Sequence, residues 1–237
     1  MALQAQELKP FKADNGKYGY KDQNGKVVVT PKYDFAYEFS EGLAGVHILG
    51  EPVGRGYGKT IRSGYINTKG EEVIPLIYTN VREFQEGLAW VNTGGEFIDN
   101  GFSQQFAGGK WGVIDKTGKE IVPPKYNIVK NFSEGLAAVS IGGNLLTGED
   151  VLYGYIDRTG KEIVPPKYDG AEMFSEGLAA VQLNGKWGFI DKTGKDVIAF
   201  DYDYVGGYST KAFKKGKIQV KKGGRFFFID KTGKEVE

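Results

Sequence analysis

Short runs of β-branched and aromatic residues, separated by glycine-rich turns, recur along the whole chain. Within each run the side chains alternate; in residues 186–191 (KWGFID), for example, two aromatic residues alternate with a glycine and an isoleucine. Such runs predict strands when turn residues bound them, and no stretch of a dozen residues shows helical periodicity. We therefore expect an all-β fold whose strands are apolar or small on both faces.

The runs belong to three phrases that always follow one another in the same order. The first phrase, KWGFIDKTGK in its clearest form, occurs six times, at residues 18–26, 63–71, 110–119, 153–161, 186–195 and 226–234. The second is IVPPKY at residues 121–126, and the third is FSEGLA at residues 132–137. Phrases repeated in a fixed order indicate a tandem repeat architecture.

Each repeat is predicted to be a three-stranded antiparallel meander. In the fifth repeat the strands are expected at residues 178–183, 186–191 and 196–200. The Asp-x-Thr-Gly segment between the second and third strands suits a hairpin loop, in which aspartate accepts backbone N–H bonds. The double proline removes two hydrogen-bond donors, so we expect the third strand to leave the sheet there. The Ser-Glu-Gly segment then turns the chain into the next repeat.

A single meander cannot cover two apolar faces, so the repeats are expected to stack on one another. We expect six meanders in an open, solenoid-like array; a closed, six-bladed propeller-like ring is the alternative. Residues 1–7 are expected to form a tail, and residues 8–237 a single array. The approximate repeat boundaries are 8–38, 39–83, 84–131, 132–173, 174–207 and 208–237.

These phrases resemble the WG repeat family, which is named for its Trp-Gly pair, over nearly the whole chain from about Leu8. The resemblance implies a β-hairpin repeat architecture found mostly in bacterial proteins. It implies neither an enzyme activity nor a particular ligand. The chain departs from the pattern at Ser63 and Phe226, which occupy the tryptophan position, and after Val236, where no PPKY phrase follows.

The composition excludes several classes of function. The 237 residues contain no cysteine and one histidine, His47, so neither a thiolate nor a multi-histidine metal site can form. A formal net charge of +1 gives no overall field that would attract nucleic acid or an anionic membrane. No apolar run approaches the roughly 18 residues of a spanning helix. We expect no cofactor and no enzyme activity.

The N-terminal residues bear on localisation. Leu3-Gln4-Ala5 before Gln6 resembles the end of a signal-peptide cleavage site, although Leu3 is larger than the residue expected there. This favours a secreted or periplasmic protein over a cytoplasmic one, and both readings stay open.

Extra length falls between the first and second strands of three consecutive repeats, at residues 47–62, 92–110 and 140–152. Equivalent loops should project from the same edge of the array, and function in repeat proteins gathers where repeats differ. Trp90 also replaces the small residue that other repeats carry at its position. The candidate partner-binding residues are Tyr57, Trp90, Phe97, Phe102, Gln104, Gln105, Phe106, Asn144 and Glu149.

The sequence therefore predicts a noncatalytic module for macromolecular interaction that binds another protein through these loops. The alternative is a repeat protein of the cell envelope that binds glycan or peptidoglycan through Trp90 and the loop aromatics. Catalytic carboxylates are not expected, because acid–base pairs need unlike environments, whereas the repeated glutamates have equivalent ones. These glutamates are Glu41, Glu86, Glu134 and Glu176.

Overall fold

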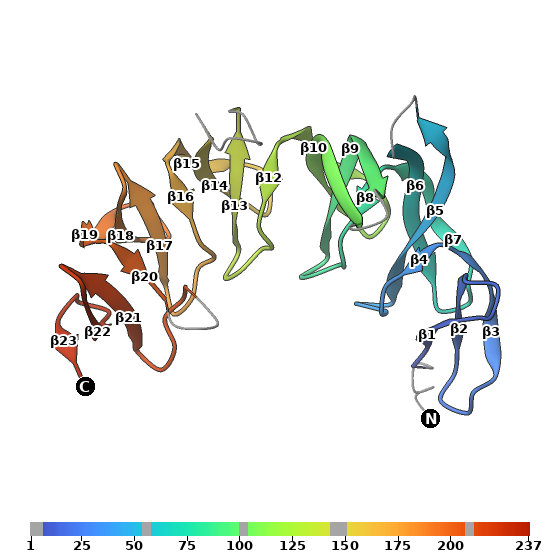
Figure 1. The fold of residues 1–237 in the computed structure, drawn as a ribbon, viewed down its shortest axis with the longest axis horizontal. Helices are drawn as coiled ribbons and strands as arrows, with labels where there is room; N and C mark the ends of the chain where they lie inside the picture. Colours follow the sequence, from blue (N-terminus) through green and yellow to red (C-terminus); the bar gives the residue numbers. More distant parts are fainter. Residues whose placement is uncertain (1–6, 54–57, 100–103, 143–150, 207–210) are drawn as a thin grey trace. The chain divides into compact units, whose positions relative to one another are not determined.

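The computed structural model describes residues 7–53, 58–99, 104–142, 151–206 and 211–237. Their regular structure consists of β-strands, as Figure 1 shows, so the all-β prediction is confirmed. Within these ranges there is accordingly no helix that could cross a membrane.

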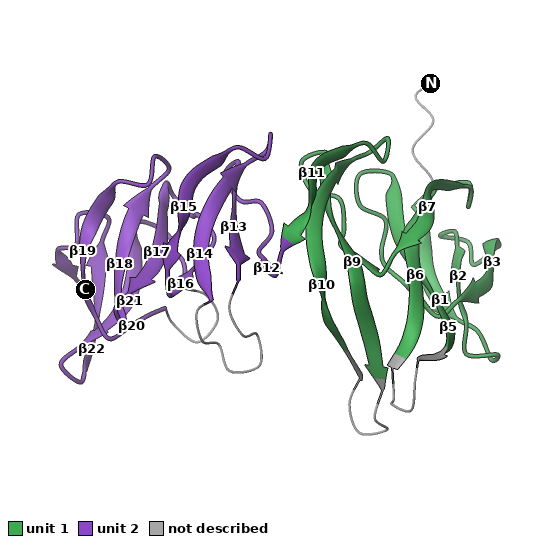
Figure 2. Ribbon diagram, turned by 90° about the horizontal axis from the view of Figure 1, so that it is seen from above, with its two compact units in different colours: residues 1–125 green, residues 126–237 purple. Residues whose placement is uncertain are grey.

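The chain divides into two compact units, residues 1–125 (unit 1) and residues 126–237 (unit 2), which Figure 2 distinguishes by colour. The strands, in chain order, are β1 (Lys9–Lys12), β2 (Tyr18–Lys21), β3 (Val27–Tyr33), β4 (Phe35–Ala36), β5 (Leu43–Val53), β6 (Gly58–Asn67), β7 (Glu72–Tyr78), β8 (Asn80–Val81), β9 (Leu88–Asp99), β10 (Gln104–Asp115), β11 (Glu120–Tyr126), β12 (Ile128–Val129), β13 (Leu136–Ile141), β14 (Leu152–Asp157), β15 (Glu162–Tyr168), β16 (Gly170–Ala171), β17 (Leu178–Leu183), β18 (Lys186–Asp191), β19 (Asp196–Tyr202), β20 (Tyr204–Val205), β21 (Lys217–Lys222), β22 (Arg225–Asp230) and β23 (Glu235–Val236).

Unit 2 contains three four-stranded antiparallel sheets, β12–β15, β16–β19 and β20–β23. Each contains the expected meander, preceded by a two-residue strand that pairs with the first long strand. Sequence patterns missed these short strands because two residues are too few to show alternation. The two-residue strands also begin each sheet shortly before the predicted repeat boundary.

Unit 1 contains the three-stranded sheet β1–β3 and an eight-stranded sheet in which two repeats are joined. These two repeats are β4–β7 and β8–β11, and the link between them is antiparallel pairing of β6 with β9. The two repeats joined in this way are the ones with the first two inserted segments.

The third strand does not leave the sheet at its prolines, contrary to the prediction. In the fourth repeat Val164 pairs with Tyr155, and pairing resumes where Tyr168 meets Tyr153. The prolines lie in an irregular stretch between these pairs, where the missing N–H donors are tolerated. Gly154 faces this stretch, and a methyl group there would lie 2.3 Å from the carbonyl oxygen of Val164. The glycine of the Trp-Gly pair therefore admits the bulged strand.

The Asp-x-Thr-Gly segments form the predicted hairpin turns. In the fifth repeat the Thr193 and Lys195 amides and the Thr193 hydroxyl all donate to Oδ1 of Asp191. These hydrogen bonds hold the pKa of the Asp191 carboxyl below its usual value. The same bonds recur at Asp115, Asp157 and Asp230.

The Ser-Glu-Gly segments also form turns, and they connect neighbouring repeats. Glu134 has a φ of 53° and is followed by Gly135 with a φ of 86°, which is the backbone of a type I′ hairpin turn. The Glu134 carboxylate accepts a 3.1 Å hydrogen bond from the Gly177 amide of the next turn and lies 3.0 Å from Nζ of Lys192. The amides of Gly87 and Gly216 donate in the same way to Glu41 and Glu176. These repeated glutamates are structural.

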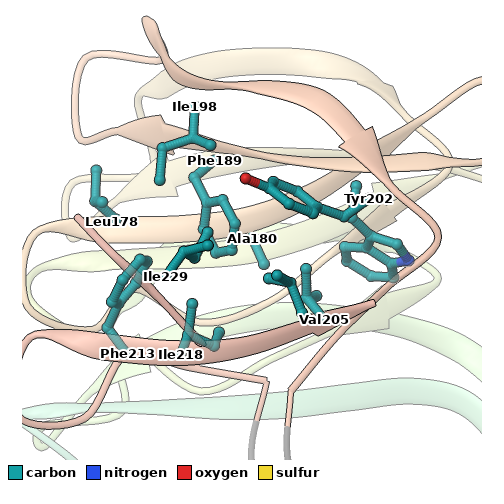
Figure 3. Close-up of a cluster of buried hydrophobic side chains, with 11 residues drawn as sticks. Leu178, Ala180, Phe189, Ile198, Tyr202, Val205, Phe213, Ile218 and Ile229 are labelled. Atoms are coloured by element: carbon teal, nitrogen blue, oxygen red, sulfur yellow. The ribbon is translucent and has the colours of Figure 1, made fainter. Parts of the chain in front are cut away.

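Within each unit, neighbouring repeats bury their aromatic and aliphatic side chains against each other, as predicted. Figure 3 shows one such cluster, in which Phe189 and Ile198 of one sheet meet Ile218 and Ile229 of the next. The ring of Phe213 lies 5.1 Å from that of Phe189 in an edge-to-face arrangement. The apolar surface removed from water between repeats is therefore the main source of stability in each unit.

Candidate functional site

The sequence suggested that the first two inserted segments are loops. In the structure, their described residues instead continue the strands of two hairpins. They lengthen β5 and β6 in the second repeat and β9 and β10 in the third (Figure 1). The two hairpins lie side by side, because Gly58 pairs with Ile98 and Lys59 with Phe97. Of the third segment, residues 143–150 lie outside the described residues.

The structure brings two of the candidate residues together in one pocket. Phe97 and Phe106 are direct partners across β9 and β10, and both line a cavity of about 260 Å³ in unit 1. Gln104 and Gln105 are in β10, beyond this pair. Tyr57, Phe102, Asn144 and Glu149 lie outside the described residues.

Trp90 does not offer its ring to a ligand, which corrects the expectation of an exposed aromatic residue. Only 3% of its surface is exposed, and it belongs to the buried part of β9. The departure from the small residue of other repeats therefore does not create an exposed ring.

The pocket has aromatic walls and no charged residue among those that line it. It is formed by side chains from the first, second and third repeats. The lining residues are Tyr18, Phe35, Ala36, Tyr37, His47, Ile61, Asn80, Phe97 and Phe106. The rings of Phe35 and Phe97 lie 5.3 Å apart, which joins the wall from β4 to the wall from β9.

The pocket lies beside Ser63, which replaces the tryptophan of the Trp-Gly pair. In the third and fifth repeats that tryptophan is buried, with 8% of Trp111 and 7% of Trp187 exposed. Ser63 is fully buried but far smaller, and it pairs with His47 just as Trp187 pairs with Gln182. An indole ring is therefore missing from the second repeat.

Two pocket residues occupy positions that contact the tryptophan in other repeats. Phe35 pairs with His47 as Gly170 pairs with Gln182, and a methyl group on Gly170 would lie 3.3 Å from Cη2 of Trp187.

The second such position is that of Tyr37, which is equivalent to Arg82 of the third repeat. The Tyr37 amide donates to the carbonyl of Gly45, and the Arg82 amide donates in the same way to the carbonyl of Trp90. The Arg82 guanidinium carbon lies 4.8 Å from the centre of the Trp111 ring. The walls that would surround the missing indole are therefore present in the second repeat.

His47 is the polar group of the pocket. Its Nδ1 lies 2.7 Å from Oγ of Ser63, whereas its Nε2 is buried and makes no hydrogen bond to the described residues. The Tyr37 ring meets the imidazole edge to face at 5.1 Å. Burial lowers the pKa of His47 to about 4, so the ring is neutral at pH 7. Burial also raises the pKa of the Tyr37 hydroxyl, which stays protonated.

A glycine-rich bulge shapes the third repeat's part of the pocket. Gly94 and Gly109 have φ values of 78° and 71°, and pairing skips both of them between Gly95–Gly108 and Thr93–Lys110. A methyl group on Gly95 would lie 2.1 Å from Cζ of Phe106, so this ring lies directly over the glycine backbone. The glycines of the insertion thus position Phe106 in the pocket wall.

The repeat pattern itself gives a sequence signal for a polar role of His47. The strand position of His47 is polar in the next two repeats as well, where Asn92 and Ser140 are both fully buried. Those two side chains accept hydrogen bonds from residues 12 or 13 positions earlier in the chain. Oδ1 of Asn92 accepts from the Thr79 hydroxyl, and Oγ of Ser140 accepts from the Ile128 amide. His47 instead bonds to Ser63, and its second nitrogen has no hydrogen-bond partner among the described residues.

Metal chemistry has no support in the described part of the chain, where no group of three His, Cys, Asp or Glu residues could hold an ion. The Ser63–His47 pair is not arranged for nucleophilic catalysis either. Ser63 is fully buried and does not line the pocket, so its hydroxyl is out of reach of a bound substrate.

Several solved structures resemble the chain, and they include the following three. An initiation factor from a eukaryote has a TM-score of 0.55 at 11% identity, and the match covers 98% of this chain and 62% of that one. The extracellular domain of a putative one-component system from B. thetaiotaomicron has a TM-score of 0.40 at 13% identity, covering 100% and 36%. A Bacteroides caccae protein of unknown function has a TM-score of 0.29 at 12% identity, covering 98% and 93%.

The first resemblance concerns the fold alone, and the chain spans less than two thirds of that initiation factor. A search of curated protein sequences found no match.

A family model described as the WG-containing repeat matches residues 18–48, 64–97, 111–144, 153–187 and 187–226. The first match, for example, runs from the second strand of one repeat, β2, into the first long strand of the next, β5, so five matches span six repeats. The chain belongs to the WG-containing repeat family.

Proposed function

We propose that this chain is a noncatalytic interaction module that binds another protein at the pocket of unit 1. The observation that carries the proposal is the pocket itself, an uncharged cavity of about 260 Å³ between two repeats whose extended hairpins are joined. Ligand sites are typically concave and mostly apolar, with a few placed polar groups. This cavity has that character, and His47 and Asn80 are among its few polar side chains.

A protein partner is favoured over a glycan by the chemistry of the lining. Aromatic and aliphatic walls suit the buried anchor side chains that dominate protein interfaces. A glycan would need many hydrogen-bonding groups, and the ring assigned to stacking on a sugar, Trp90, is buried. The extended hairpins beside the pocket add β-strand surface that a partner can contact around its anchor.

The test compares two variants of the full-length protein. Phe106→Ala removes part of the pocket wall, whereas the matched control Phe228→Ala removes a partly exposed ring from β22, outside the pocket. A partner is first captured from cell extract with wild-type protein, then purified, and its dissociation constant is measured by titration calorimetry. We expect Phe106→Ala to weaken binding by about tenfold or more and Phe228→Ala to leave it unchanged.

Thermal unfolding followed by circular dichroism checks that both variants are folded. Equal affinity of the wild type and a folded Phe106→Ala variant for the purified partner would remove the pocket from the interface.

A further inference from the structure

The pocket of the second repeat lies where the third and fifth repeats hold an indole. Ser63 has replaced the tryptophan, but Phe35 and Tyr37 remain at the positions that contact Trp187 and Trp111 in their own repeats. The walls are therefore already arranged around a flat, two-ring group. In the third and fifth repeats, Trp111 and Trp187 fill the corresponding position themselves.

The size of the cavity agrees with such a group. An apolar cavity of about 150 Å³ accepts benzene in an engineered protein. The cavity here, at about 260 Å³, is large enough for a ring system larger than benzene. Its aromatic walls favour offset and edge-to-face contacts with another aromatic ring.

His47 supplies one directional contact to such a ring. When Nδ1–H donates to Oγ of Ser63, Nε2 carries a lone pair and has no partner among the described residues. An indole N–H is a donor only, so it complements this tautomer. A buried acceptor without a hydrogen-bond partner is unfavourable, and a bound N–H group removes that cost.

We propose that the pocket is a receptor for a tryptophan side chain of the partner protein, whose indole takes the place of the missing ring and donates its N–H to Nε2 of His47. The assignment rests on the proposed function, because it names the anchor that the partner inserts. The site selects a flat aromatic ring over an aliphatic side chain through its walls, and an N–H donor through His47.

The experiment uses N-acetyl-L-tryptophanamide as a probe and the full-length protein. Binding is followed through the ¹⁵N resonances of the single histidine, which report the tautomer and the contact at Nε2 together. We expect saturable binding with a dissociation constant of about 0.1–1 mM, the range for a fragment of this size. N-acetyl-L-leucinamide is expected to bind at least tenfold more weakly, and the 1-methylindole analogue about threefold to tenfold more weakly.

Two variants test the location. Ser63→Trp restores the ring from within the chain, so it should abolish probe binding. Its matched control is Phe226→Trp, which makes the same residue at the same repeat position in the sixth repeat, where the side chain is exposed; it should leave binding unchanged. Probe binding by a folded Ser63→Trp variant equal to that of the wild type would overturn the proposal.

The wild-type titration decides the question even when Ser63→Trp does not fold, since an unperturbed His47 resonance at millimolar probe excludes an indole in contact with Nε2. This failure is distinguishable from that of the proposed function. A partner that is sensitive to Phe106→Ala, with no response to the probe, keeps the interaction module and rejects tryptophan as its anchor. A response to the probe, with a partner that is insensitive to Phe106→Ala, keeps the indole site and rejects the interface.

Discussion

His47 and Ser63 face each other on β5 and β6, at a position where other repeats pair a polar residue with an aromatic ring. Two single-residue changes thus create the features that a ligand needs: Ser63 frees volume, and His47 places a polar atom beside it. Ser63 was visible in the sequence as a departure from the repeat, and His47 was visible at a position that is polar in the next two repeats as well. Their combined effect was not, because the sequence alone does not show that strand pairing brings positions 47 and 63 together.

The protonation of His47 gives a prediction at this scale. Its folded-state pKa of about 4 is below the unfolded value of about 6.5, so folding favours the neutral ring. This stabilisation is present above pH 6.5 and is lost as the pH falls towards 4, because the unfolded state then binds a proton that the folded state does not. We expect the free energy of unfolding to fall by about 2–3 kcal/mol over this interval.

The measurement is urea denaturation of the wild type and of His47→Asn at several pH values. The difference between the two pH profiles isolates the histidine from the carboxylates that titrate in the same range. A His47→Asn variant with the same pH slope as the wild type between pH 6.5 and 4.5 would contradict the assignment.

At the scale of strands and turns, the structure of each repeat depends on two turn motifs and on strands with alternating side chains, and the sequence shows both clearly. Turns were predictable because Asp-x-Thr-Gly and Glu-Gly have specific backbone requirements, and strands because their alternation extends over several residues. The prolines of residues 163–168 led to a wrong prediction. Because they lack N–H donors, strand pairing was expected to end there, but a bulge opposite Gly154 accommodates the prolines and pairing resumes after them. Two-residue strands such as β16 are too short for any pattern to reveal.

The glycine of the Trp-Gly pair gives the prediction at this scale. Gly154→Ala would place a methyl group 2.3 Å from the carbonyl oxygen of Val164 and 2.7 Å from the nitrogen of Pro166, both backbone atoms. We expect it to lower the free energy of unfolding by about 2–4 kcal/mol, measured by urea denaturation.

Gly170→Ala is the matched control, since its new methyl group would meet only side-chain atoms of Gln182 and Trp187, at 3.3 Å. A smaller loss in Gly154→Ala than in Gly170→Ala would show that the close approach of the bulge does not explain the glycine.

At the scale of the whole molecule, the chain forms two compact units, and the repeats within each unit pack on their neighbours. The repeat architecture was predictable from the order of phrases, because stacking is the way in which short meanders bury both faces. The division into two units was not, since the phrases continue across residue 125 without interruption. The joining of the second and third repeats into one sheet also has no signal in the phrases.

The prediction at this scale concerns fragments. Residues 1–125 and residues 126–237 should each fold when expressed alone, because a repeat array is stabilised mainly by contacts between neighbours. We expect a β-type circular dichroism spectrum and a cooperative thermal transition from both fragments. The fragment of residues 1–125 should also keep the affinity of the full chain for N-acetyl-L-tryptophanamide, because every lining residue of the pocket belongs to it.

A fragment that ends at residue 83 is the control for pocket integrity, because it lacks the strands that carry Phe97 and Phe106. It should not bind the probe. A fragment of residues 126–237 that melts without a cooperative transition would show that unit 2 depends on the rest of the chain.

Hydrogen bonds from a Gly amide to the glutamate of the preceding turn, as between Gly177 and Glu134, fix the spacing of repeats within each unit at one end of the strands. At the opposite ends the hairpins range from the tight Asn184-Gly185 turn to the long β9–β10 pair, where β9 pairs with β6 of the preceding repeat. Mutations can thus change the length and sequence of the hairpins at one end of the strands, while the hydrogen-bonded turns at the other end maintain the spacing of the repeats. A lineage of such proteins can acquire new binding partners without redesigning its framework.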